Sequence, residues 1–226
     1  MPRRLSSTRD NVVMALLHRH RDLIADATRG AAITNRPLYE IGGVVLPGPL
    51  PNAPVVNITS RTGVVNVDCN RKTLAHWHTH PPHTALASNI IFTPPSSADV
   101  FWSIITSLNG VSPVLYVVCT YGMYEVCPTA IAITQMRRAI NTLCATNRKC
   151  MNNIIHRCKT DWDFSLTKHG ALIGFSPTGS HHIDRLLDDK DVRMRMFSQT
   201  SLRSAHAICK QWWGQFNVNI RFIVRQ

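Results

Sequence analysis

The sequence predicts an α+β fold followed by a C-terminal extension of helix and strand. Short β-branched runs bounded by Pro and Gly alternate with helical stretches, in the order α-β-β-β-α-β-β-α, which favours an α+β or α/β arrangement. The chain has 226 residues, 44% of them hydrophobic, which is enough to fill a core. We expect a domain over residues 1–158 and an extension over residues 159–226 that packs on the same domain.

The first part of the chain is predicted to hold one helix and several short strands. Apolar residues at helical spacing predict a helix from Thr8 to Arg29, and Gly30 is expected to end it. Beyond this helix, β-rich runs separated by Pro and Gly predict strands at 38–48, 55–59 and 63–67, and residues 73–79 then lead into Pro81-Pro82. A loop over residues 81–95 with four prolines then leads to the next helix.

The second part is predicted to begin with a helix from Ala98 to Leu108, for which Ser96 and Ser97 are candidate N-caps. Runs at 113–120 and 123–127 predict a β-hairpin. A long helix is expected from Ala130 to about Cys150, followed by a helix over 201–213 and a strand over 216–224.

Cysteine usage and hydropathy bear on the compartment. The seven cysteines are odd in number and lack CxxC spacing, so we expect reduced thiols rather than a disulfide scaffold. No apolar run is long enough to cross a bilayer, and no signal-like stretch follows the N-terminus. We therefore expect a soluble, intracellular protein of cytoplasm or nucleus with no membrane partner; non-classical export is compatible with the same features.

Charge is unevenly distributed along the chain. The formal net charge is +12, yet residues 73–136 contain no Lys or Arg and carry −2, so the remainder carries +14. A segment without basic residues argues against a nucleic-acid groove running through it. Only two of the thirteen acidic residues are glutamates, Glu40 and Glu125, so a mechanism that needs a glutamate has two candidates.

The motif His76-Trp-His78-Thr-His80-Pro81 carries the strongest chemical signal. Alternate residues of a strand face the same side, so His78 and His80 would present two imidazoles to one point, as a metal site requires. The same spacing also occurs as a polar strand edge or by chance. His76 shares that face and His83 follows closely, and we interpret both as neighbours of the site rather than ligands.

Two acidic residues complete the constellation. The segment Ser96-Ser97-Ala98-Asp99 places a carboxylate three residues after a serine at a helix start, so both side chains face the same end of the helix. Two imidazoles and one carboxylate leave a fourth position open, which is the form of a catalytic zinc site. Glu40 lies beside Gly42-Gly43, where small residues allow another backbone or a substrate to approach closely.

In the order of these motifs the sequence resembles the JAMM family (MPN-plus, JAB1/MPN/Mov34) of zinc metalloproteases. The family signature is a Glu on an early strand, then His-x-His-Pro, then Ser-x-x-Asp; here these are Glu40, His78-Thr-His80-Pro81 and Ser96-Ser-Ala-Asp99. The stretch from Thr120 to Val126 is similar to the family's later hairpin, so the resemblance covers about residues 38–128. It implies a JAMM/MPN-like, cytidine-deaminase-like fold with a central mixed β-sheet flanked by helices. The segment between His80 and Asp99 is longer than is usual in the family, and we interpret residues 82–95 as an insertion at the cleft.

By that resemblance the protein is a Zn²⁺-dependent hydrolase of peptide or isopeptide bonds. His78, His80 and Asp99 would hold Zn²⁺, and Glu40 would act as general base and acid. Ser96 would donate a hydrogen bond to the oxyanion, or would serve only as an N-cap worth about 1 kcal/mol. Ubiquitin-like conjugates are the leading substrate class, with ubiquitin or a ubiquitin-like protein as partner.

Two functions of other classes stay open. One is a JAMM-like interaction or scaffold module without protease activity, and the other is association with nucleic acid, which rests on net charge alone.

A metallo-β-lactamase-like site needs an acid two residues after the second His, where this chain has Pro82. A second zinc site is not expected, because the spacing of its candidate ligands fits no standard zinc finger; these are Cys144, Cys150, His156 and Cys158. Glu125 is expected to be structural. The oligomeric state is open.

Overall fold

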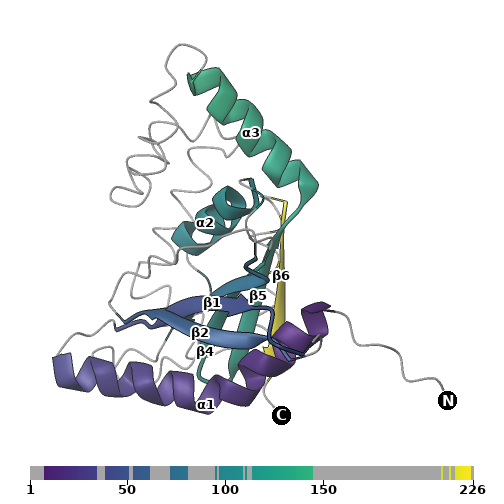
Figure 1. The fold of residues 1–226 in the computed structure, drawn as a ribbon. Helices are drawn as coiled ribbons and strands as arrows, with labels where there is room; N and C mark the ends of the chain where they lie inside the picture. Colours follow the sequence, from purple (N-terminus) through teal and green to yellow (C-terminus); the bar gives the residue numbers. More distant parts are fainter. Residues whose placement is uncertain are drawn as a thin grey trace.

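The fold consists of one mixed β-sheet with helices on both faces (Figure 1). The structure is a computed structural model that describes residues 8–34, 39–50, 53–61, 72–80, 95, 97–108, 110, 114–144, 210, 214 and 217–224. Helix α1 covers one face of the sheet, and helices α2 and α3 lie on the other side (Figure 1). The α+β class with a mixed central sheet is therefore confirmed.

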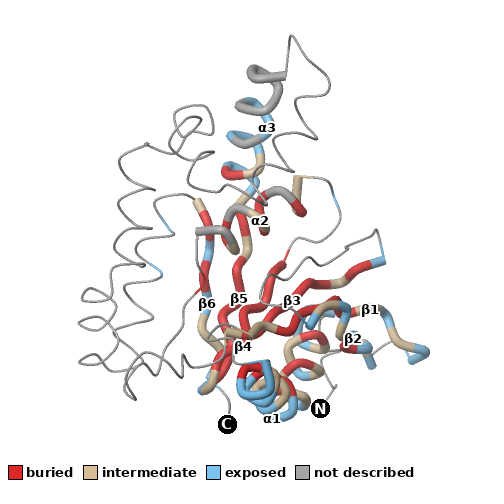
Figure 2. The backbone as a smooth tube through the Cα atoms, turned by 90° about the vertical axis from the view of Figure 1, so that its left-hand side faces the viewer, coloured by how far each residue is buried: buried red, intermediate tan, exposed pale blue. Residues whose placement is uncertain are grey.

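The sheet has six strands in the order β2-β1-β3-β4-β5-β6. Strands β3 and β4 are paired in parallel, and all the other neighbours are antiparallel. The residues of the central strands are mostly buried, because helices cover both faces of the sheet there (Figure 2). The strands are β1 (Gly42–Leu46), β2 (Val55–Ser60), β3 (Ala75–His80), β4 (Leu115–Cys119), β5 (Gly122–Pro128) and β6 (Val218–Val224).

Helix α1 (Thr8–Thr34) buries an apolar stripe against one face of the sheet. Leu16 and Leu23 pack there in one cluster with Trp77 of β3 and Tyr116 of β4. The helix is also tied to the β4–β5 turn by a polar contact. The buried His20 Nε2–H donates to the carbonyls of Cys119 and Gly122, at 2.7 and 3.2 Å.

The end predicted for α1 at Gly30 is wrong, because the helix continues to Thr34. Gly30 has a packing role instead: a Cβ at this position would lie 2.0 Å from a ring carbon of Tyr39. The glycine therefore lets the Tyr39 ring lie directly against the helix, just before the chain enters β1. Sequence patterns cannot distinguish a glycine that ends a helix from one that admits a neighbouring ring.

Helices α2 (Ser97–Leu108) and α3 (Ala130–Cys144) pack against each other and against β5. Val100 and Ile104 of α2 are buried, and the Ser103 hydroxyl donates to the Val126 carbonyl of β5 at 3.5 Å. Thr129 caps α3, since its hydroxyl accepts a hydrogen bond from the Ala132 N–H at 3.3 Å.

Most other predicted elements in the described part of the chain are confirmed with shifts of a few residues at their ends. The strand predicted at 63–67, the helix over 201–213 apart from Lys210, and the continuation of α3 beyond Cys144 lie outside the described residues. Strand β6 comes from the predicted extension and pairs with β5 at one edge of the sheet. Among the described helices, none combines the length and hydropathy needed to cross a membrane.

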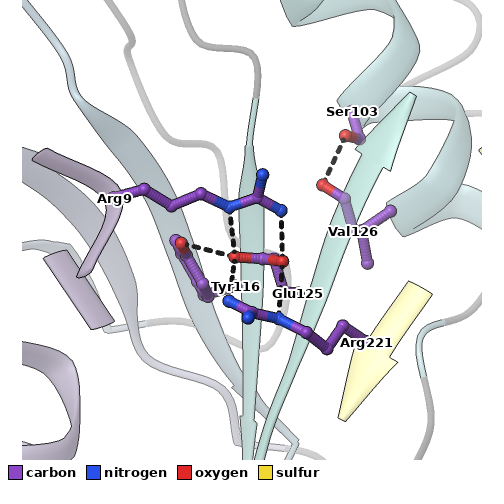
Figure 3. A network of polar contacts seen from close by, with 6 residues as sticks. All are labelled: Arg9, Ser103, Tyr116, Glu125, Val126 and Arg221. Carbon is purple, nitrogen blue, oxygen red and sulfur yellow. Dashed lines mark hydrogen bonds and ion pairs between the residues drawn. The ribbon is translucent and has the colours of Figure 1, made fainter. Parts of the chain in front are cut away.

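A buried carboxylate joins the two ends of the described chain on the α1 face (Figure 3). Glu125 of β5 is 1% exposed and accepts hydrogen bonds from Arg9 of α1 and Arg221 of β6. Both Arg221 contacts measure 3.1 Å, and the Tyr116 hydroxyl donates to the same carboxylate at 2.9 Å. Glu125 thus has the structural role expected from the sequence.

The charge of Glu125 is stabilised by its three partners. Burial alone would raise the pKa of Glu125, but the hydrogen bonds from Arg9, Arg221 and Tyr116 outweigh burial and hold the pKa below its ordinary value of 4.5. The ionised group therefore contributes stability that is present above about pH 4.5 and is lost as the pH falls through the folded-state pKa.

We predict that Glu125→Gln lowers the free energy of unfolding by about 1–3 kcal/mol at pH 7, since charge-assisted hydrogen bonds are lost. The deficit should be constant above about pH 4.5 and should shrink as the pH falls further, because the wild type then loses the same charge. Urea unfolding at several pH values measures it. As a control, Asp26→Asn removes the partly exposed 3.6 Å pair with Arg29 and should change stability by less than about 0.5 kcal/mol. A deficit for Glu125→Gln that stays constant below about pH 4.5 as well would contradict the prediction.

Candidate metal centre

Strand β3 brings two imidazoles to one point. His78 and His80 project from the same side of the strand, and their Nε2 atoms lie 3.1 Å apart with ring centroids 4.9 Å apart. The intervening Trp77 and Thr79 are directed to the opposite side, where Trp77 is fully buried in the α1 core. The alternation expected from the sequence therefore places the two histidines on one face.

The first turn of α2 brings a carboxylate to the same point. Asp99 Oδ1 lies 3.0 Å from His78 Nε2, and Asp99 Oδ2 lies 3.4 Å from His80 Nε2. Helix α2 follows β3 in the chain and packs on this face of the sheet, so its N-terminal turn lies at the end of the strand that carries the histidines. The Asp99 side chain is 13% exposed and is thus accessible to a small solute.

A second carboxylate approaches from the segment that leads into β1. Glu40 Oε1 lies 3.6 Å from His80 Nε2. The register pairs Gly42 with His78, so two residues earlier Glu40 comes opposite His80 on the same face. The neighbouring Gly43 meets β2 at a register shift, where a Cβ would lie 1.8 Å from the Asn57 carbonyl oxygen. The close backbone approach expected at Gly42-Gly43 is thereby confirmed.

The four side chains converge more closely than ordinary hydrogen bonds explain. Each imidazole nitrogen can carry one proton, yet His80 Nε2 lies within 3.6 Å of three acceptor or donor groups. Glu40, His78 and His80 each offer a ligand atom within 4.8 Å of the others, and this group could bind a metal ion. A cation at the shared point would satisfy all of these lone pairs at once.

The electrostatics of the site favour a positive charge. Desolvation raises the pKa of Glu40 to about 7, with His80 opposing this shift and Asp99 adding to it. Burial and the neighbouring His78 lower the pKa of His76 to about 3, so His76 stays neutral beside the site. Two carboxyl groups therefore lie at the convergence point, and the neutral imidazole of His76 lies beside it.

The structure brings together four of the five residues singled out from the sequence, namely Glu40, His78, His80 and Asp99. Ser96, the fifth, lies outside the described residues, as do His83 and the segment 81–94. Thr79, between the two histidines, is not marked by any sequence motif. Its hydroxyl contacts the backbone of Ile41, next to Glu40.

No family model, curated protein or solved structure matches this chain. Function is therefore inferred from the residues of the site and their geometry.

We predict that the protein binds one divalent transition-metal ion at this point, and that His78→Ala or His80→Ala abolishes tight binding. Calorimetric titration of metal-free protein with Zn²⁺ measures the stoichiometry and affinity. At a free metal concentration of about 100 times Kd, binding should stabilise the fold by about 2.7 kcal/mol. His18→Ala, at an exposed histidine of α1, is the matched control and should bind as the wild type does. Equal binding by His18→Ala and His80→Ala would exclude the site.

Proposed function

We propose that this protein is a zinc-dependent hydrolase of peptide or isopeptide bonds with a JAMM/MPN-like catalytic domain. One observation carries the proposal: the Glu, His-x-His and Asp elements of the motif, which are far apart in sequence, converge within hydrogen-bond or ion-pair distance. A mixed sheet between α1 on one face and α2 and α3 on the other is compatible with such a domain.

The donor set suits zinc. Imidazole nitrogen and carboxylate oxygen are common zinc ligands, and in a tetrahedral site with metal–ligand bonds of about 2.0–2.1 Å the ligand atoms lie roughly 3.3 Å apart. Asp99 Oδ1 lies 3.0 Å from His78 Nε2, Asp99 Oδ2 lies 3.4 Å from His80 Nε2, and the two Nε2 atoms are 3.1 Å apart. These separations are close to that spacing, so His78, His80 and Asp99 would be able to hold one zinc ion.

The remaining carboxylate is suited to proton transfer. Glu40 Oε1 lies 3.6 Å from His80 Nε2, and Glu40 belongs with His78 and His80 to the group that could bind a metal ion. With Asp99 as the third ligand, Glu40 would be left beside the ion as a proton acceptor. When bound, zinc would lower the pKa of a water molecule and polarise the scissile carbonyl. Glu40 would accept a proton from the attacking water at its Oε atoms and return it to the departing amine. His78, His80 and Asp99 would hold the ion in place.

The proposed substrates follow from the resemblance to the JAMM family, for which isopeptide bonds of ubiquitin-like conjugates are the leading substrate class. Ser96 keeps its proposed part as oxyanion donor, because it immediately precedes α2 in the sequence and lies three residues before Asp99.

We predict opposite phenotypes for the two carboxylates. Glu40→Gln should retain one bound Zn²⁺ at saturating metal and lower kcat by about 10²–10⁴-fold, since it removes the proton acceptor. Asp99→Asn should lose most of the bound Zn²⁺, because an amide is a poorer ligand. Metal analysis beside cleavage of di-ubiquitin and of ubiquitin-like fusions measures both effects.

The outcomes separate the candidate functions. If Glu40→Gln lost its zinc while Asp99→Asn bound as much zinc as the wild type, Glu40 would be the metal ligand and Asp99 the proton acceptor. Activity retained in Glu40→Gln would exclude Glu40 as the base. A wild-type protein that binds no metal and cleaves no conjugate would leave the scaffold module as the better description.

A further inference from the structure

We propose that Thr79 is a positioning residue that fixes Glu40 against His78 and His80 by binding the backbone on both sides of Ile41. The inference rests on the proposed metal site, but it concerns a residue outside the set of proposed ligands, base and oxyanion donor. Thr79 lies between the two histidines, and its side chain is directed to the opposite face of the sheet, so it cannot touch a reactant.

The contacts of Thr79 hold two successive peptide groups. The Ile41 N–H, which belongs to the peptide bond joining Glu40 to Ile41, donates to Thr79 Oγ1 at 3.1 Å. The Thr79 N–H donates to the Ile41 carbonyl, which belongs to the next peptide bond, at 2.8 Å. The first of these planes contains the Cα of Glu40, so fixing it fixes the point from which the Glu40 side chain extends.

The Thr79 hydroxyl binds the chain just before the main-chain hydrogen bonds between β1 and β3 begin. Strand β1 starts at Gly42, paired with His78, and Ile41 lies one residue before it. In an antiparallel hydrogen-bonded pair, the Ile41 N–H would donate to a main-chain carbonyl. Here the Thr79 side-chain oxygen accepts that hydrogen bond instead. β3 is therefore hydrogen-bonded also to the segment before β1, which carries Glu40.

Burial makes this contact effective. Thr79 is fully buried and Ile41 is 1% exposed, so water does not compete for the hydrogen bond. The branched Cβ of threonine also limits the side chain to few rotamers, which keeps Oγ1 aimed at Ile41. Valine has nearly the same shape without the acceptor, and serine keeps the acceptor. The three residues therefore separate the hydrogen bond from packing.

The test is a double-mutant cycle on zinc affinity, measured by competition with a chromophoric chelator in the otherwise intact chain. A carboxylate this close to a dication attracts the ion whether or not it is a ligand, so affinity reports the position of Glu40. We expect Thr79→Val to weaken zinc binding about 10-fold or more, as is typical for loss of a residue that supports a metal ligand. The same substitution in a Glu40→Gln background should have little further effect.

Two further variants complete the design. Thr79→Ser should restore most of the affinity. Thr106→Val removes another buried threonine hydroxyl, which donates to backbone carbonyls within α2, and should bind zinc as the wild type does. In the metal-free protein, amide hydrogen exchange at Ile41 should be faster in Thr79→Val than in the wild type. It should be unchanged in Thr79→Ser and in Thr106→Val.

Equal losses of affinity for Thr79→Val in the wild-type and Glu40→Gln backgrounds would overturn the proposal, as would no loss in either. Failure of the proposed function has a different signature. In that case the effects of Thr79→Val and Glu40→Gln on zinc affinity are still coupled, while the wild type cleaves no conjugate. If conjugates are cleaved, Thr79→Val should lower kcat with KM unchanged.

Discussion

The alternation of side chains along β3 is the constraint on which the rest of the structure depends. Trp77 anchors the strand from one side, because its ring is fully buried in the cluster formed with α1. His78 and His80 are then directed to the other side, toward α2. A slip of one residue would put the indole into the site and the imidazoles into the apolar core, which would strongly disfavour that register. The packing of α1 therefore fixes which face carries the chemistry.

Neighbouring strands convert this alternation into a site. β1 and β4 flank β3 on its two sides, so the strand cannot move without disrupting both pairings. His80 is aligned with Cys119 of β4, and the turn after Cys119 is held by the hydrogen bonds from His20. The end of β3 that carries the histidines is thus supported from α1 through the β4–β5 turn, while Glu40 enters from the β1 side.

The parts of this arrangement that follow local patterns could be predicted from the sequence. The period of two in β3 and the serine-led start of α2 are local, and they indicate the face of the histidines and the position of Asp99. The reason for Gly30, the Tyr39 ring, comes from another segment, so the sequence pattern wrongly predicts a helix end there. The role of Thr79 depends on Ile41 lying opposite, 38 residues away in sequence, and no motif marks it. Arg9 and Arg221 lie 116 and 96 residues from Glu125, so no local pattern could pair them with it.

The two glutamates of the chain show how the same residue type acquires different roles. Glu125 lies in the stretch without basic residues and is neutralised by arginines from α1 and β6, so its charge is fully used in holding the fold. Glu40 is also largely buried, but among the described residues its ion-pair contact is with a histidine and not with an arginine. A desolvated carboxylate without a strong cationic partner is costly to keep in a fold. A metal ion bound beside the two imidazoles and Asp99 would supply the missing charge, in agreement with the chemistry proposed for the site.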